Sequence, residues 1–135
     1  MSRRGVSLAE LMMAVTIVAI LASMALPQYR RTVERGYWNA SQDILRTIYA
    51  GQQVFFSFNG QFLDAPASLA DWRRIYMDDP NISSPMPVTF SVSASGAGGS
   101  AIFTATAERN CGSPPCPFME INDANTLNVG SWPRP

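Results

Sequence analysis

An apolar run from Val6 to Leu26 constrains this chain more than any other feature of its sequence. A helix over this run would be about 30 Å long, close to the thickness of the hydrocarbon core of a bilayer. One charged residue, Glu10, lies near the start of the run. A carboxylate at the centre of a membrane helix costs about 2.5–3.5 kcal/mol, and less near one end. The position of Glu10 therefore needs a physical explanation.

Three ordinary roles of an N-terminus account for the apolar run but leave the acid unexplained. Arg3, Arg4 and the run fit a secretory signal peptide, with Ser23 and Ala25 as small residues placed for cleavage. The arginine pair also resembles the start of a twin-arginine export signal, which usually precedes an apolar region without an acid. A plain transmembrane anchor fits the length, but Glu10 would then only add an energetic cost.

A fourth interpretation gives the glutamate a purpose. If a peptidase cuts after Gly5, Val6 becomes a new N-terminus with a cationic α-amino group. The amine of a neighbouring subunit would then pair with Glu10 and neutralise both charges in apolar surroundings, where unpaired ions are heavily penalised. Glu10 would fix the register between subunits, because only one stagger brings the amine and the carboxylate together.

The stretch RRGVSLAELMMAVTIVAILASMALPQY resembles the class III signal of type IV prepilins. It has a short basic leader, residues 1–5, a glycine before the cut, a glutamate at the fifth mature position and a proline that closes the run. The resemblance implies that Gly5 and Val6 form the prepilin peptidase site and that Val6 becomes N-methylated. It also implies that Glu10 is the assembly glutamate and that Pro27 kinks the helix. Two residues depart from the family: Val6 replaces the usual phenylalanine, and Ala9 stands where isoleucine is common.

Beyond Pro27 the sequence becomes amphipathic and keeps the period of a helix. The helical spacing predicts an apolar stripe against a head domain, formed by Val33, Tyr37, Ala40, Ile44, Ile48, Gly51, Phe55 and Phe58. Asn59 and Gly60 tolerate left-handed backbone and should end this helix, which would span residues 6–58. Its first half, residues 6–26, has no apolar partner within the subunit, so we expect it to lie in a membrane or among copies of itself.

Both ends of the amphipathic segment carry a further signal. Pro27 predicts a kink or local melting, because proline removes one backbone hydrogen bond and clashes with the preceding turn. The alternative is a helix that ends at Leu26, followed by a second helix. At the other end, the sequence again resembles pilins, whose helix commonly ends in an aromatic pair followed by Asn-Gly and another aromatic. These positions are Phe55, Phe56, Asn59, Gly60 and Phe62.

Residues 59–135 are expected to form the globular head. Ser68 and Asp71 predict a capping box for a short helix within a connecting segment, residues 59–86. The alternation in PVTFSVSAS and AIFTATAE predicts a β-hairpin with GAGGS as its turn, and FMEIN and TLNVG give two further short strands. The sheet would lie within residues 87–130. The predicted class is α+β, a long N-terminal helix packed on a small antiparallel sheet of three to four strands, as in the type IV pilin fold.

The composition argues against several functional classes. Ten basic residues balance ten acidic ones, so no basic excess suggests a nucleic-acid partner. The chain has no histidine and no lysine, and no two acids form a recognisable catalytic dyad. The GAGG stretch lies in a predicted hairpin and not between a strand and a helix, so it is not a phosphate loop. We therefore expect no enzyme, no cofactor and no metal.

Two cysteines and a small acidic cluster remain. Cys111 and Cys116 enclose GSPP, and beside an export-like N-terminus they fit a disulfide better than free thiols or a zinc site. Such a short loop would stabilise the fold by only about 2 kcal/mol, and it is shorter than the loop of many pilins. Asp78, Asp79 and Asn81 could offer oxygen atoms to calcium, but their setting is more simply a turn.

Together these features predict a structural subunit of a type IV pilus, processed after Gly5, N-methylated at Val6 and polymerised through its apolar helix. The expected partners are other pilin subunits in a homopolymer, the prepilin peptidase, the inner-membrane pilus or secretion machinery, and membrane lipid before assembly. The precursor would be a single-pass protein of a bacterial inner membrane, and the mature subunit would lie in an extracellular filament or a periplasmic pseudopilus. A type II secretion pseudopilin and an exported binding module with an ordinary signal peptide are the alternatives.

Overall fold

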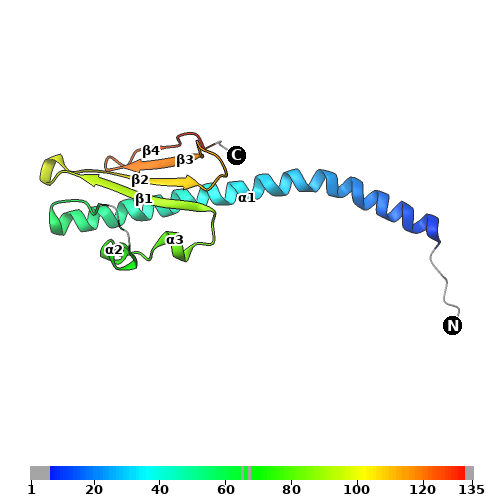
Figure 1. Ribbon diagram of the computed structural model, residues 1–135, viewed down its shortest axis with the longest axis horizontal. Helices are drawn as coiled ribbons and strands as arrows, with labels where there is room; N and C mark the ends of the chain where they lie inside the picture. The colour runs from blue at the N-terminus through cyan, green and yellow to red at the C-terminus, as the bar shows by residue number, and fades with distance from the viewer. Residues whose placement is uncertain (1–6, 65, 67, 133–135) are drawn as a thin grey trace. The chain divides into compact units, whose positions relative to one another are not determined.

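The computed structural model describes residues 7–64, 66 and 68–132. The elements follow in the order α1 (Leu8–Asn59), α2 (Leu69–Arg74), α3 (Pro80–Ser83), β1 (Val88–Ser95), a short 3-10 helix (Gly98–Ser100), β2 (Ile102–Arg109), β3 (Phe118–Asn122) and β4 (Leu127–Asn128) (Figure 1). The chain divides into two compact units, Met1–Gly36 and Tyr37–Pro135, and α1 contributes to both. The predicted α+β class is confirmed, and the fold is consistent with that of type IV pilins.

Helix α1 continues through Pro27 without interruption. The alternative of a helix that ends at Leu26 is therefore wrong, whereas the kink at Pro27 stays a prediction. The helix ends at Asn59, one residue beyond the expected end. The Asn59 side chain donates from Nδ2 to the carbonyl oxygen of Phe55 at 2.8 Å, and Gly60 adopts a φ of 67°, in the left-handed region. Glycine reaches this region without steric cost, which explains why the helix stops there.

The buried stripe of α1 is rotated relative to the predicted one. Ile48, Gly51 and Phe55 are buried as expected, but Phe58 is 77% exposed. The residues that the pattern missed are Ser41, Leu45 and Gln52, all fully buried. At about 100° per residue, Phe58 lies to one side of the row formed by Leu45, Ile48 and Gln52. The apolar character of Phe58 was therefore a poor guide to its position.

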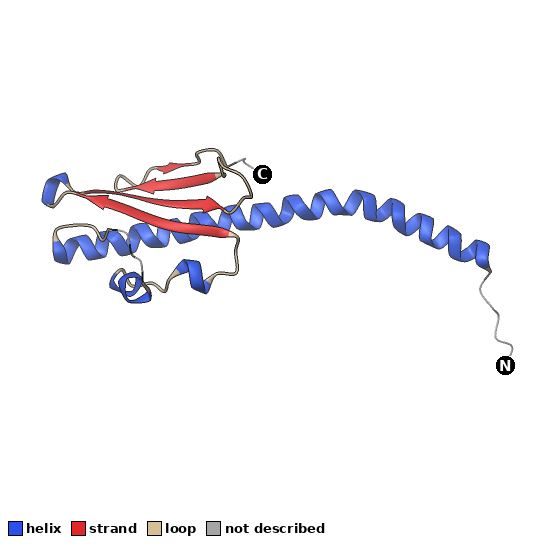
Figure 2. Cartoon of the chain, viewed as in Figure 1, coloured by secondary structure: helices blue, strands red, loops and turns tan. Residues whose placement is uncertain are grey.

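The sheet is antiparallel throughout, in the order β1-β2-β3-β4. Its strands alternate as predicted, with Val88, Phe90 and Val92 of β1 buried and the threonine and serine between them exposed. Within the second unit, the apolar face of the sheet lies on α1 (Figure 2). The buried apolar core comprises Leu45, Ile48, Phe55, Phe62, Leu63, Trp72, Ile75, Val88, Phe90, Val92, Phe103, Ala105, Ala107, Met119, Ile121 and Trp132.

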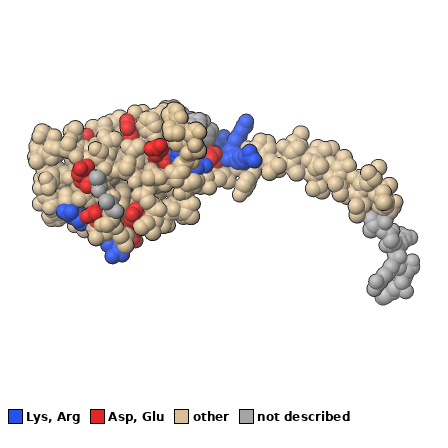
Figure 3. Space-filling view, in the orientation of Figure 1, with Lys and Arg blue, Asp and Glu red and all other residues tan. Residues whose placement is uncertain are grey.

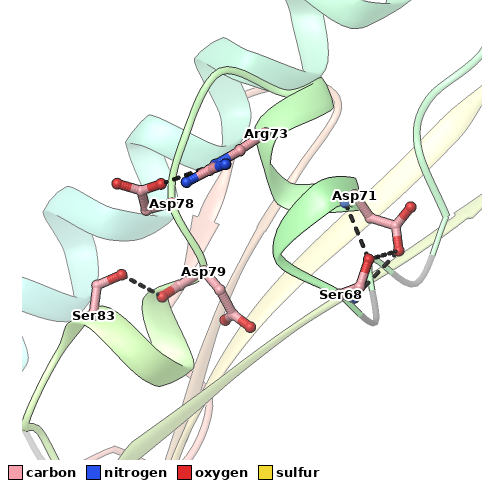
Figure 4. A network of polar contacts seen from close by, with 6 residues as sticks. All are labelled: Ser68, Asp71, Arg73, Asp78, Asp79 and Ser83. Atoms are coloured by element: carbon pink, nitrogen blue, oxygen red, sulfur yellow. Dashed lines mark hydrogen bonds and ion pairs between the residues drawn. The ribbon is translucent and has the colours of Figure 1, made fainter.

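Helix α2 begins with the predicted capping box. The Ser68 hydroxyl accepts a hydrogen bond from the backbone N–H of Asp71 at 3.3 Å, and the Asp71 carboxylate accepts one from the N–H of Ser68 at 3.2 Å (Figure 4). Helix α3 was not predicted, since its sequence was interpreted as a turn. The element is only four residues long, and Pro80 occupies its start, where the absent N–H costs nothing.

Gly51 allows α1 to approach the end of α2 closely. A Cβ atom at this position would overlap the carbonyl oxygen of Ile75. We expect Gly51→Ala to lower the free energy of unfolding by about 1–3 kcal/mol, because the buried backbone at Ile75 has to move. Gly36 lies in the same helix and has nothing within 4 Å of an added Cβ, so Gly36→Ala is the matched control.

The Gly36→Ala variant should be neutral or more stable by about 0.5–1 kcal/mol, since alanine is the better helix former. The measurement is urea unfolding of the full chain in detergent, followed by the fluorescence of the buried Trp72 and Trp132. Equal losses of stability in both variants would contradict the close approach at Gly51.

Candidate functional site in the N-terminal part of α1

Residues 8–26 of α1 present large apolar side chains at the surface of their unit. Leu8, Met13 and Met24 are exposed by 77%, 72% and 70%. By length and composition this helix could cross a membrane, and none of its most apolar stretch is buried. Figure 3 shows most of this stretch without charged atoms. An apolar surface this large marks an interaction with lipid or with other protein.

The hydroxyl groups of this stretch are paired within the helix itself. Thr16 Oγ1 donates to the carbonyl oxygen of Met12 at 2.8 Å, and Ser23 Oγ donates to that of Ile20 at 2.7 Å. A hydroxyl bonded in this way loses little on transfer to apolar surroundings, because its donor is not left unpaired. Among residues 8–26, only Glu10 therefore carries a polar side chain that the helix does not satisfy.

Glu10 lies in the first turn of α1 and has no hydrogen-bond or ion-pair partner among the described residues. Free N–H groups at a helix start stabilise an acid by about 0.3–1 kcal/mol, less than the cost of a charge inside an apolar bundle. Beside it lies a shallow hollow of about 420 Å³ lined by Leu11, Ala14, Val15 and Val18. The small side chain of Ala14 allows another helix to approach closely at this point.

The remaining N-terminal predictions are distributed along the helix. Gly5 and Val6 lie outside the described residues, so the cleavage and methylation sites stay predictions. Pro27 lies inside α1, about 25 Å from Glu10 along the helix axis. The structure does not bring Glu10 and Pro27 together.

The acidic cluster at α3 is used for local structure. Asp79 Oδ1 accepts a hydrogen bond from the N–H of Asn81 at 2.9 Å. Figure 4 shows the exposed ion pair that Asp78 forms with Arg73 at 3.5 Å. The Asn81 amide bonds both backbone groups of Phe90, donating at 3.0 Å and accepting at 2.7 Å. Asp79 therefore caps the start of α3, a short helix where a turn was expected, and Asn81 joins α3 to β1. Within the described residues, no group of three or more His, Cys, Asp and Glu could hold a metal ion.

Cys111 and Cys116 are joined by a disulfide in the connection between β2 and β3. The N–H of Arg109 donates to the carbonyl oxygen of Pro117 at 2.7 Å, on the far side of this loop. Ser131 Oγ donates to the carbonyl oxygen of Cys116 at 3.4 Å. The disulfide loop is thus attached to both the sheet and the C-terminal segment, and it lies far in sequence from the apolar helix.

Sequence reasoning overlooked a group of arginines that follows the apolar stretch. Arg30, Arg31 and Arg35 are exposed, and none forms an ion pair within the described part of the chain. The signal that could have revealed them is the abrupt change from an apolar run to three cations within one and a half helical turns.

Known proteins share sequence features with the N-terminal segment of this chain. Residues 1–26 match the prokaryotic N-terminal methylation motif. Over 61 residues the chain is 34% identical to the type IV major pilin protein PilA of Myxococcus xanthus (strain DK1622). The matched region covers 45% of this chain and 28% of that relative. No solved structure matches the chain. The motif and the relative support a type IV pilin-like subunit.

Proposed function

We propose that this chain is a structural subunit of a type IV pilus, made as a prepilin and polymerised through the apolar part of α1. The observation that carries the proposal is Glu10, a lone carboxylate on an exposed apolar helix without a partner among the described residues. The methylation motif over residues 1–26 and the similarity to a pilin support the same assignment. The role is structural and not catalytic.

The assembly mechanism follows from the charges of this segment. Cleavage after Gly5 creates a cationic amine at Val6, and N-methylation leaves that amine protonated. On assembly, the helix moves from lipid into a bundle of identical helices, with little change in polarity. The hydrophobic effect therefore contributes little to the choice of register, which depends on close packing and on the pair between Glu10 and the amine of a neighbouring subunit.

The head would form the exterior of the filament. The face of the sheet opposite the core is polar, and its side chains align across the strands. One such row is formed by Ser91, Thr106, Glu120 and Asn128. A polar outer face suits contact with solvent, whereas the apolar helix requires cover.

The intact mass of the mature protein tests the processing step. We expect a chain that begins at a methylated Val6. A chain that begins at Leu26 would contradict the proposal and support an exported module with an ordinary signal peptide. Electron microscopy of cells with and without the gene then tests the filament. Surface filaments that contain this chain are expected, whereas confinement to a periplasmic pseudopilus would assign the chain to a secretion system.

A further inference from the structure

Three exposed arginines form a basic collar directly after the apolar stretch. We use the name arginine collar for Arg30, Arg31 and Arg35, which lie in the same compact unit as residues 8–26. None of the three makes a hydrogen bond or ion pair with the described residues. Tyr29, immediately before them, is 69% exposed. Guanidinium groups bind phosphate oxygens in a bidentate manner, so an unpaired cluster beside an apolar helix suits a phosphate-bearing partner.

The spacing between the collar and Glu10 matches a bilayer. Arg30 lies twenty positions after Glu10, which is about 30 Å of helix and about the thickness of the hydrocarbon core. If the collar lies among the headgroups of one leaflet, Glu10 reaches the boundary of the opposite leaflet, where a charge costs little. Tyr29 would lie at the interface, where amphipathic aromatic rings are enriched.

We propose that the arginine collar binds the phosphates of anionic phospholipid headgroups and sets the depth of the precursor in the membrane. The proposal rests on the membrane-held precursor of the proposed function. In that precursor the collar lies on the exported side, against the usual preference of basic residues for the cytoplasmic side. Binding to headgroups accounts for cations at that position. It also explains how the unpaired Glu10 is tolerated before a partner amine is available.

A second copy of the chain is the competing occupant of the collar. The unit Tyr37–Pro135 carries more acidic than basic residues, so its surface could attract the arginines of another copy. The lipid is favoured because one placement satisfies both ends of the apolar stretch, the collar at one boundary and Glu10 at the other. A contact between copies would not explain why the distance from Glu10 to Arg30 is about equal to the thickness of the hydrocarbon core.

The first test measures lipid retention by the full chain. The protein is held in mixed micelles with phosphatidylglycerol and phosphatidylcholine, and the lipids retained are identified by native mass spectrometry. The unmodified chain should retain phosphatidylglycerol preferentially. Arg30→Gln/Arg31→Gln should reduce that preference about 30-fold, since each cation near an anionic surface contributes about fivefold in affinity. Arg46→Gln/Arg73→Gln, two exposed arginines of the other unit, is the matched control and should retain the preference.

The second test measures depth in vesicles that contain phosphatidylglycerol. Ile20→Trp places a reporter midway between Glu10 and Arg30, while Trp38, Trp72 and Trp132 lie outside the apolar stretch. Lipids brominated at the ends of their acyl chains should quench the reporter most strongly. Adding Arg30→Gln/Arg31→Gln should shift the strongest quenching toward lipids brominated near the headgroup.

Each result either supports the proposal or overturns it. An unchanged preference for phosphatidylglycerol, or an unchanged depth in the double variant, would overturn it. If the double variant lost filaments but still retained phosphatidylglycerol, the arginines would belong to a contact between copies, and this result would also overturn the proposal. Failure of the proposed function is seen separately, as an absence of filaments from cells with the unmodified chain, and would not alter the lipid measurements.

Discussion

Replacing Glu10 with alanine is expected to remove the chain from surface filaments while export and leader cleavage continue. In the proposed assembly mechanism, the substitution would leave the amine of Val6 in a neighbouring subunit without a counter-charge in apolar surroundings. Breaking a buried pair in this way costs about 3–5 kcal/mol, which lowers the equilibrium constant for adding each subunit by about 150- to 4,000-fold. The measurement is an immunoblot of sheared filaments against whole cells, with electron microscopy of the same strains.

Two further variants separate charge from shape in this experiment. Glu10→Gln keeps the size of the side chain but loses its charge, so it should fail to assemble as the alanine variant does. Asp43→Ala removes an exposed acid from the second half of the same helix and should assemble normally. Normal piliation in the Glu10→Ala strain would exclude the pairing mechanism, whatever the behaviour of the other two variants.

Gln52→Leu is expected to cause the largest loss of stability of any substitution considered for the head. Gln52 is fully buried on α1, and its amide Nε2 donates to the carbonyl oxygen of Leu63 at 2.8 Å. Its Oε1 atom accepts from the N–H of Leu63, also at 2.8 Å. Leucine can make neither bond and leaves two buried backbone groups unpaired. At about 1–3 kcal/mol for each group, the loss is about 2–6 kcal/mol, a large share of the stability of a typical domain.

The neighbouring Gln53 provides a control of the same chemistry. Gln53 is half-buried, and its side chain forms no hydrogen bond with the residues that the structure describes. Gln53→Leu should therefore change the free energy of unfolding by no more than about 0.5 kcal/mol. Urea unfolding of the full chain in detergent, monitored by tryptophan fluorescence, compares the two variants. A similar loss in both variants would show that the two hydrogen bonds with Leu63 do not contribute the expected free energy of unfolding.

Much of the fold follows from local patterns. Alternation at Val88, Phe90 and Val92 predicted which face of β1 is buried, because successive side chains of a strand point to opposite faces. The capping box at Ser68 and Asp71 and the helix end at Asn59 depend on hydrogen bonds between residues three or four positions apart. Such interactions can be recognised from the sequence because both partners lie within one short segment.

The polar residues of the core could not be predicted in the same way. Ser41 and Gln52 have the composition of exposed helix positions, yet both are fully buried. Gln52 is tolerated there because the backbone of Leu63, eleven residues away, returns to meet it after the helix has ended. Likewise, Gly51 cannot carry a side chain because the backbone of Ile75, at the end of α2, lies against it. Neither partner is visible in the local sequence pattern.

The candidate site likewise has features that the sequence predicts and features that only the tertiary structure decides. A single acid in an apolar run singles out Glu10 in the sequence alone, and the length of the run already limits its surroundings to lipid or other helices. The tertiary structure decided which face of α1 the sheet covers and which polar groups lie inside. The physical reason is that apolar periodicity belongs to one segment, whereas the hydrogen-bond partner of a buried polar group such as Gln52 comes from a distant part of the chain.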